Sequence, residues 1–224
     1  MRRRWPIVWL ALALTALCGA PAAQAASLKF KQCGDVAFTC ARLSVPLDRA
    51  GVVPGRVSLL VKRRETIAKR RRGVLVVLAG GPGQSATEAL GGESSRGVAA
   101  ALDSRDVIVY DQRGTGRSGL LRCPSLERAG VFDFARPAAE CARKLGPRRG
   151  FYTSKDTADD LEAIRKALGV EKLSLFGVSY GTRTAQAYAL RYPTLPRCAA
   201  SCPTSAAGGS SRRARAARDP DPRP

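Results

Sequence analysis

Four short apolar runs divide the middle of the chain. They cover residues 56–61, 73–78, 106–110 and 173–176 and are rich in Val, Ile and Leu. A continuous apolar run such as 73–78 is typical of a strand that is buried on both faces of a sheet. The runs therefore predict four strands.

Helical patterns stand between and after the last two runs. Residues 156–168 place Leu161, Ile164 and Leu168 at helical spacing, and Gly169 suits the position after a helix end. Acidic residues near the start of this helix and basic residues near its end favour the helix dipole: Asp156, Asp159, Asp160, Arg165 and Lys166. A second helix is predicted over 182–192. Strands that alternate with helices indicate an α/β fold with a mostly parallel sheet and flanking helices.

Composition bounds the function. The chain has 224 residues, enough for one domain, and its 38 Lys and Arg outnumber 18 Asp and Glu, a net charge of +20. The basic residues are mostly Arg and are spread along the chain, with no zinc-ligand spacing or RNA-binding motif. We therefore expect no nucleic-acid partner.

The chain contains no His. It cannot by itself form a Ser-His-Asp triad, a Cys-His dyad or a His-ligated metal site.

The N-terminus is typical of a secretory signal. Three arginines at 2–4 precede an uncharged apolar segment at 7–17, and an A-x-A cleavage site ends at Ala25. The apolar segment is shorter than the roughly 20 residues that span a bilayer, although a membrane anchor is the alternative. We expect a mature chain that begins at Ala26, lies outside the cytoplasm and has no stable membrane anchor.

Export makes disulfides the favoured interpretation of the cysteines. Cys33 and Cys40 flank a short loop, and Cys123 and Cys141 flank a segment with the Pro and Gly content of a long loop. We therefore predict two pairs, Cys33 with Cys40 and Cys123 with Cys141. Metal binding is the competing interpretation, but the chain has no Cys-x-x-Cys pair and no His to support it.

Residues 177–181 read GVSYG and fit the G-x-S-x-G pattern of a nucleophile elbow. The pattern is common by chance, and an ordinary strand-to-helix turn is the plain alternative. A predicted strand before it and a predicted helix after it supply the context that an elbow requires. Ser179 is therefore the candidate nucleophile.

Two further motifs follow predicted strands. Residues 79–83 read AGGPG, where a glycine-rich turn allows backbone N–H groups to face a developing oxyanion, with a plain tight turn as the alternative. Residues 111–119 read DQRGTGRSG, whose glycines match a dinucleotide fingerprint. No helix is predicted directly after them, so no helix N-terminus is available for a pyrophosphate. We expect no nucleotide cofactor.

Together the motifs carry a family resemblance. LAGGPGQSAT (78–87), YDQRGTGRSG (110–119) and GVSYGT (177–182), with CARLSVPLDR (40–49) before them, resemble exported α/β-hydrolases related to tripeptidyl aminopeptidases and proline iminopeptidases. The resemblance implies that Ser179 is the acylating nucleophile. It also implies an oxyanion hole from the backbone N–H of Tyr180 and one from the turn at Gly80 and Gly81. Such enzymes remove short peptides or proline from a free N-terminus and use no cofactor. We therefore expect a peptide or small ester substrate. Ala79 stands where the cytoplasmic iminopeptidases have His, which weakens a proline-specific assignment.

The resemblance ends near Pro193. Residues 194–224 contain six Arg, two Asp (Asp219 and Asp221, both poor triad candidates) and no run of three strongly apolar residues. We therefore expect a signal at 1–25, a partial hydrolase domain at 26–193 and a disordered, low-complexity basic tail at 194–224. In that interpretation the chain is a truncated or frameshifted family member, inactive without His and the triad Asp, and its sheet ends at the strand before Ser179. A non-catalytic exported binding protein and an esterase on the same scaffold are the alternatives.

Overall fold

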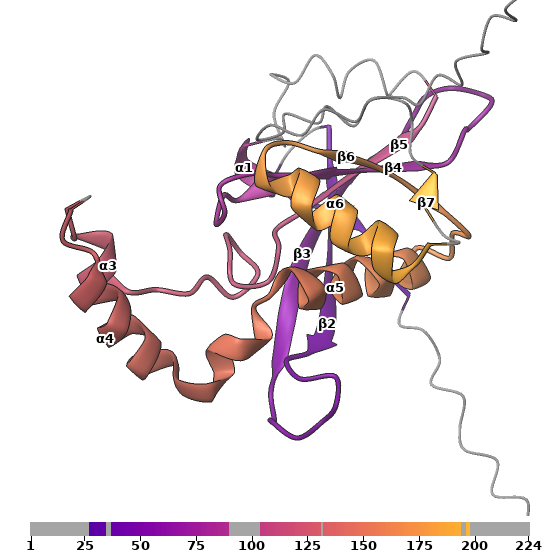
Figure 1. Cartoon of the computed structure of the whole chain (residues 1–224). Helices are drawn as coiled ribbons and strands as arrows, with labels where there is room; N and C mark the ends of the chain where they lie inside the picture. The colour runs from indigo at the N-terminus through magenta and orange to yellow at the C-terminus, as the bar shows by residue number, and fades with distance from the viewer. Residues whose placement is uncertain (1–26, 35–36, 90–103, 131, 194–195, 198–224) are drawn as a thin grey trace, which may run out of the picture.

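The structure is a computed structural model that describes residues 27–34, 37–89, 104–130, 132–193 and 196–197 (Figure 1). The predicted signal at 1–25 and nearly all of the predicted tail at 194–224 lie outside the described residues.

The described strands form one mixed sheet in the order β1-β2-β3-β5-β4-β6-β7. Their bounds are β1 Lys31–Gln32, β2 Thr39–Pro46, β3 Arg56–Arg64, β4 Val74–Leu78, β5 Asp106–Tyr110, β6 Leu173–Gly177 and β7 Pro196–Arg197. β1, β2 and β3 are antiparallel to their neighbours, including β5, whereas β5, β4, β6 and β7 run parallel. Three of the four predicted runs form the parallel strands β4, β5 and β6. The fourth, 56–61, lies in β3, which is antiparallel to both of its neighbours.

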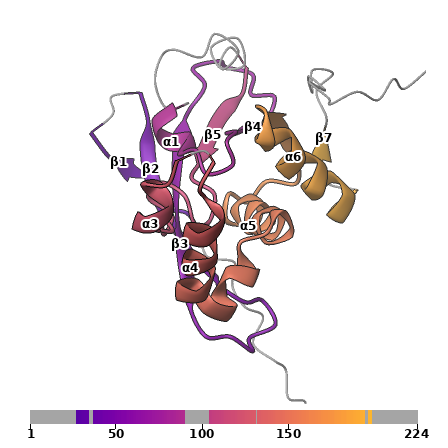
Figure 2. The same ribbon diagram turned by 60° about the vertical axis from the view of Figure 1, so that its left-hand side comes forward.

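Two longer helices cover one face of the parallel strands. They are α5, Ser154–Ala167, and α6, Tyr180–Arg191, which pack against each other (Figures 1 and 2). Leu161 and Ile164 of α5 and Tyr188 of α6 are buried in the core with Val76 and Ile108 of the sheet. The other face of the strands carries a second buried cluster: Phe38, Leu75, Val77, Val107 and Val109.

The remaining helical segments are short or lie to one side. α1, Ala86–Ala89, follows the AGGPG turn. α3, Pro124–Glu127, α4, Ala135–Leu145, and the 3₁₀ helix η1, Gly146–Phe151, form an arm that extends away from the parallel strands at the left of Figure 1. The segment between Cys123 and Cys141 is therefore largely helical, where the sequence predicted a long loop.

The structure also changes the expected edge of the sheet. The sequence indicated that the sheet would end at β6. Instead β7 pairs with β6 through Pro196 beside Leu173 and Arg197 beside Ser174. Among the described residues, this outer pairing covers the first two residues of β6.

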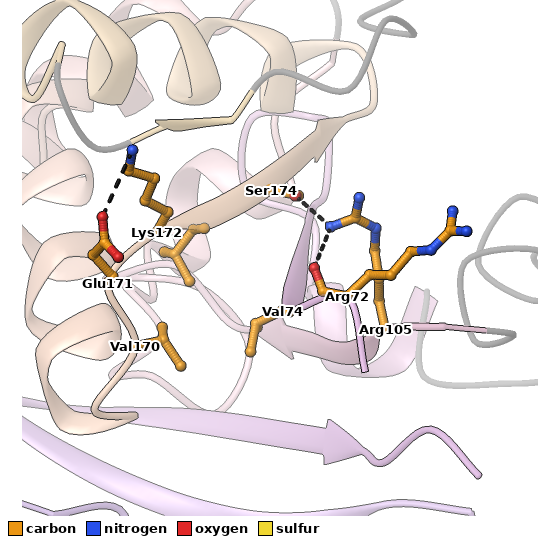
Figure 3. Close-up of a pocket in the computed structure, with 9 residues that line it drawn as sticks. Arg72, Val74, Arg105, Val170, Glu171, Lys172 and Ser174 are labelled. Atoms are coloured by element: carbon orange, nitrogen blue, oxygen red, sulfur yellow. Dashed lines mark hydrogen bonds and ion pairs between the residues drawn. The ribbon is translucent and has the colours of Figure 1, made fainter. Parts of the chain in front are cut away.

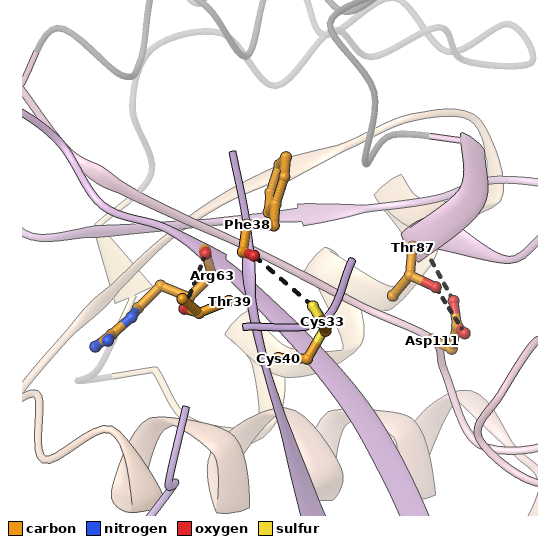
Figure 4. Close-up of a disulfide and its surroundings, with 7 residues drawn as sticks. All are labelled: Cys33, Phe38, Thr39, Cys40, Arg63, Thr87 and Asp111. Atoms are coloured by element: carbon orange, nitrogen blue, oxygen red, sulfur yellow. Dashed lines mark hydrogen bonds between the residues drawn. A yellow bond between two sulfur atoms is a disulfide. The ribbon is translucent and has the colours of Figure 1, made fainter. Parts of the chain in front are cut away.

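Both predicted cysteine pairs are joined in the structure. Cys33 and Cys40 are 5.7 Å apart at Cα and tie β1 to β2, beside Phe38 (Figure 4). Cys123 and Cys141 are 5.6 Å apart at Cα and join the residue before α3 to the middle of α4. The second disulfide therefore closes the base of the arm.

Candidate active site

Ser179 lies at a strained turn between β6 and α6. Its φ of 50° and ψ of −117° make it the one non-glycine residue with positive φ in the described part of the chain. Such a conformation is costly for a residue with a side chain and is concentrated at functional sites. The turn places Ser179 directly before the first residue of α6, with its side chain exposed to solvent.

The register of the sheet brings the two predicted motifs together. β4 and β6 are parallel neighbours, and Leu78 at the end of β4 pairs with Gly177 at the end of β6. The N–H of Val178 donates to the carbonyl of Leu78 at 3.0 Å. The residues that follow the two strands, the AGGPG turn and the elbow, must therefore lie side by side.

Glycine at the two ends of the elbow permits this close approach. A Cβ at Gly177 would lie 2.6 Å from the backbone of Gly181. A Cβ at Gly181 would lie 2.7 Å from the carbonyl carbon of Leu78 and 2.9 Å from the Ala79 oxygen. These three distances are shorter than a real Cβ atom makes to its neighbours, so glycine at both ends of G-x-S-x-G is a packing requirement of this turn.

The Gly80–Gly81 turn lies against the nucleophile. A Cβ at Gly80 would lie 3.0 Å from the Ser179 Cβ and 3.6 Å from its Oγ. Gly81 has a φ of +102°, which a residue with a side chain rarely adopts. Tyr180 is the first residue of α6, where backbone N–H groups have no acceptor within the helix. The structure thus gathers Ser179, Tyr180, Gly80 and Gly81 at one place, as the resemblance implies.

The described residues offer Ser179 no base. No hydrogen bond to its Oγ is present within them. Lys172 precedes β6 and therefore lies at the opposite end of this strand, where its ammonium is 3.6 Å from Glu171 (Figure 3). It lines a cavity of about 270 Å³ with Arg72 and Arg105. This cavity opens at the amino ends of the parallel strands, away from the elbow.

A buried ion pair behind the site was missed by the sequence analysis. Arg113 is 4% exposed and donates to both oxygens of Asp160 at 2.7 and 2.6 Å. Arg49 donates to the same carboxylate at 2.7 Å. Asp159 is also buried and binds Arg191 and the Tyr192 hydroxyl. The interpretation of these two aspartates as partners of the helix dipole was therefore wrong; Asp156 alone fills that role, in a capping box with Thr153.

Within the described ranges, no group of three His, Cys, Asp or Glu side chains is placed to hold a metal ion. None of the helices that the structure describes is both long and apolar enough to cross a membrane.

Comparison with known proteins agrees with this geometry. The family model described as "alpha/beta hydrolase fold" matches residues 73–221, about two thirds of the chain. The chain belongs to the α/β-hydrolase fold family. The match begins at β4, includes both motifs and the elbow, and continues into the segment that the sequence analysis had set apart as a tail.

Several of the relatives that the chain resembles carry peptidase names. The chain is 30% identical over 176 residues to a tripeptidyl aminopeptidase of Streptomyces coelicolor, covering 69% of this chain and 32% of the relative. It is 33% identical over 181 residues to the serine protease Hip1 of Mycobacterium bovis, covering 69% and 33%. A proline iminopeptidase of Heyndrickxia coagulans is 30% identical over 120 residues, covering 54% and 31%. The chain thus spans about a third of the length of the curated relatives it matches.

Among solved structures, the chain is similar to the proline iminopeptidase of Mycobacterium smegmatis, with a TM-score of 0.44 and 23% identity. That similarity covers 70% of this chain and 41% of the other.

Proposed function

We propose that this chain carries the nucleophile half of an exported serine hydrolase of the aminopeptidase type, which releases short N-terminal peptides or proline. The observation that carries the proposal is Ser179 in its strained turn, with Gly80 packed against it. The aminopeptidase and serine protease names of the relatives favour a peptide substrate. The predicted signal at 1–25 favours export.

The geometry suits acyl transfer. Ser179 Oγ would attack the carbonyl carbon of a peptide or ester, forming an O–C bond while the carbonyl π electrons move to the oxygen. The resulting oxyanion would accept hydrogen bonds from the Tyr180 N–H and from the Gly80–Gly81 turn. The tetrahedral intermediate would then expel the amine or alcohol, which takes up the proton that the Ser179 hydroxyl loses. Water would next attack the acyl-serine ester, releasing the acid and returning a proton to Ser179 Oγ. No step requires a cofactor or metal.

The proposed reaction needs a base that accepts the proton of the Ser179 hydroxyl. Ser is a weak nucleophile unless an adjacent base accepts its proton, and the chain contains no His. We therefore propose that this chain alone does not turn over peptide or ester substrates. Without triad members, an oxyanion hole and binding alone leave on the order of 10³–10⁴-fold catalysis over water, far below that of a working enzyme.

The test is labelling with a fluorophosphonate probe. In buffer we expect no labelling of Ser179 and no release of amino-terminal peptides. Free imidazole at high concentration would supply the missing base: the Oγ–P bond forms, fluoride leaves and imidazole takes the proton. We expect slow labelling under those conditions that is lost in Ser179→Ala and kept in Ser125→Ala, a matched change on α3.

The outcomes separate the candidates. Labelling without imidazole that is lost in Ser179→Ala would overturn the proposed inactivity. Absence of labelling with imidazole would contradict the hydrolase site and favour the binding-protein alternative. If Ser179 is labelled with imidazole and small esters are cleaved while peptides are not, the esterase alternative replaces the aminopeptidase assignment.

A further inference from the structure

Three consecutive side chains after β5 contact the surroundings of the candidate nucleophile. They are Asp111, Gln112 and Arg113, the first residues of the DQRGTGRSG motif, and all three are buried. The acyl-transfer chemistry proposed above does not use them. Asp111 and Gln112 bind the two ends of the segment that contains the Gly80–Gly81 turn. Arg113 binds α5 and the residues just before it.

Asp111 holds the segment after the glycine turn. Its side chain is 0% exposed and accepts a hydrogen bond from the Ser85 hydroxyl at 3.0 Å. It also accepts from the Thr87 N–H at 2.9 Å and the Thr87 hydroxyl at 3.0 Å (Figure 4). The N–H of Arg117, from its own loop, adds a fourth at 2.8 Å. A Cβ at Gly116 would overlap the Asp111 carboxylate, so glycine is required there. The carboxylate therefore ties its own loop to the beginning of α1.

Gln112 holds the segment before the same turn. Its side-chain amide donates to the Ala79 carbonyl at 3.4 Å. Ala79 and Ser85 lie on either side of the Gly80–Gly81 turn. Asp111 and Gln112, neighbours in one loop, therefore anchor both ends of the segment whose Gly80 packs against Ser179.

Arg113 holds the other side of the elbow through α5. Besides its two bonds to Asp160, it donates to the Phe151 carbonyl at 2.7 Å, just before α5 begins. Ser154 is the first residue of α5, and its hydroxyl lies 2.9 Å from the Tyr180 hydroxyl. Arg113 thus fixes both the body and the beginning of the helix whose first residue contacts Tyr180.

We propose that Asp111, Gln112 and Arg113 are positioning residues for the oxyanion hole. Asp111 and Gln112 fix the Gly80–Gly81 turn, and Arg113 fixes Tyr180 through α5. The inference rests on the proposed function, because the hole is the feature being positioned. Small displacements of hydrogen-bond donors slow catalysis strongly. We call the buried hydrogen bonds of Asp111, Gln112 and Arg113 the brace, and its role is to hold the oxyanion donors in place.

The first test measures the turn itself by amide hydrogen exchange. Asp111→Asn replaces one acceptor oxygen with an NH₂ group, which opposes the donors of Thr87 or Arg117. We expect amides of residues 84–89 to exchange at least about tenfold faster, the effect of losing one such hydrogen bond. Asp48→Asn is the matched control, because Asp48 likewise accepts several hydrogen bonds, in its case from three backbone N–H groups of the β2–β3 hairpin.

The control decides the interpretation. A faster exchange confined to Asp111→Asn supports the brace. Equal exchange of residues 84–89 in the two variants overturns it, because the effect would then be global. If Asp111→Asn does not fold, Thr87→Val removes one of the same hydrogen bonds more mildly and is judged by the same comparison.

The second test measures the hole with a product-like ligand. Trialanine carries a carboxylate that the oxyanion donors would bind, and amide resonances of Gly81 and Tyr180 would report the contact. We expect Asp111→Asn and Gln112→Met to weaken this binding about tenfold, while Asp48→Asn leaves it unchanged. Unchanged affinity in both test variants would overturn the positioning role. If trialanine moves neither resonance in the natural chain, the proposed function fails, and the exchange experiment alone decides whether the brace exists.

The third test addresses Arg113. Arg113→Lys keeps the charge but cannot make the two-pronged contact with Asp160. Arg165→Lys is the matched control, since Arg165 makes the same contact with Glu162 near the other end of α5. We expect the Tyr180 amide resonance to move in Arg113→Lys and in Ser154→Ala, and to stay in Arg165→Lys. A Tyr180 resonance that stays in Arg113→Lys, or that moves as far in Arg165→Lys, would overturn this part of the proposal.

Discussion

Gly181 packs its Cα against the carbonyl groups of Leu78 and Ala79, at the end of β4. Gly177 packs against Gly181 in turn, and Gly80 packs against Ser179. At the scale of single residues, the close packing of the site therefore depends on glycines, which have no side chain. This explains why a short pattern with fixed glycine positions could be recognised in the sequence: a Cβ at Gly177 or Gly181 would overlap backbone atoms, so these two positions require glycine.

Gly181→Ala tests this packing. The added methyl group would overlap backbone atoms of β4 that cannot move without disturbing the sheet. We expect a loss of about 1–3 kcal/mol in the free energy of unfolding, as for other overpacked sites. Gly150→Ala is the control, since a Cβ there meets nothing within 4 Å. Urea unfolding followed by circular dichroism measures both, and equal stabilities for the two variants would contradict the packing argument.

Glu162 provides a pH-dependent contribution to stability. Burial raises the pKa of its carboxyl, but hydrogen bonds from Arg165 and Tyr188 outweigh burial and hold the pKa below its ordinary value of 4.5. A carboxyl with a lowered pKa in the folded state stabilises the fold above the unfolded pKa, and this contribution is lost as the pH falls through the folded pKa.

Glu162→Gln removes that dependence. We expect the natural chain to melt at a higher temperature than the variant at neutral pH, and the difference to shrink as the pH falls below about 4.5. Thermal melts across this pH range measure the difference. A gap in melting temperature that is constant or grows with acidity would show that the charge of Glu162 does not contribute.

At the scale of elements, the apolar pattern predicted what local sequence controls. The strands at β4, β5 and β6 and the helix α5 agree with their predicted positions to within about two residues. The arm was missed because Pro124, Gly130 and Pro137 are typical of loops. Proline is nevertheless tolerated in the first turn of a helix, and Pro124 and Pro137 both lie there, in α3 and α4.

Long-range polar contacts could not be predicted in the same way. Asp160 lies on the buried side of α5, but its partners Arg113 and Arg49 precede it by 47 and 111 residues. The pattern around Asp160 matches the acidic beginning of any helix, and only the fold identifies the arginines. The same holds for Asp111, whose motif was recognised while its contact with Thr87 was not.

The disulfide of the arm has a testable consequence at this scale. Cys123 and Cys141 are 18 positions apart in the sequence, a loop length for which cross-linking stabilises a fold by about 3 kcal/mol. We expect Cys123→Ser/Cys141→Ser to lose stability of that order. Non-reducing peptide mapping of the natural chain should find Cys123 with Cys141 and Cys33 with Cys40. Crossed pairs or free thiols after oxidative folding would contradict both the pairing and its contribution.

At the scale of the whole molecule, the site follows from strand order. β4 lies between β5 and β6, so the three loops that follow these strands meet at one edge of the sheet. These loops contain the AGGPG turn, the DQRGTGRSG motif and the elbow, which are separated by many residues in the chain. Alternating strands and helices predicted a parallel sheet, but the sequence pattern alone does not determine which strand lies in the centre.

The location of the molecule in the cell is the last prediction. Disulfides form and persist in oxidising compartments, and the structure joins two cysteine pairs. The sequence before residue 26 has the three parts of a secretory signal. We therefore expect the protein to be exported and cleaved after Ala25, so that N-terminal sequencing of the secreted form begins at Ala26.

Substitutions at the cleavage site sharpen this test. Ala25→Phe places a bulky residue where signal peptidase requires a small one, so the precursor should accumulate with Met1 at its N-terminus. Ala22→Phe makes the same change outside the A-x-A site and should leave cleavage at Ala25 intact. If the unsubstituted protein keeps Met1 and remains in the membrane fraction, residues 7–17 anchor it instead. If the unsubstituted protein is found in the cytoplasm with reduced cysteines, the prediction of export is wrong.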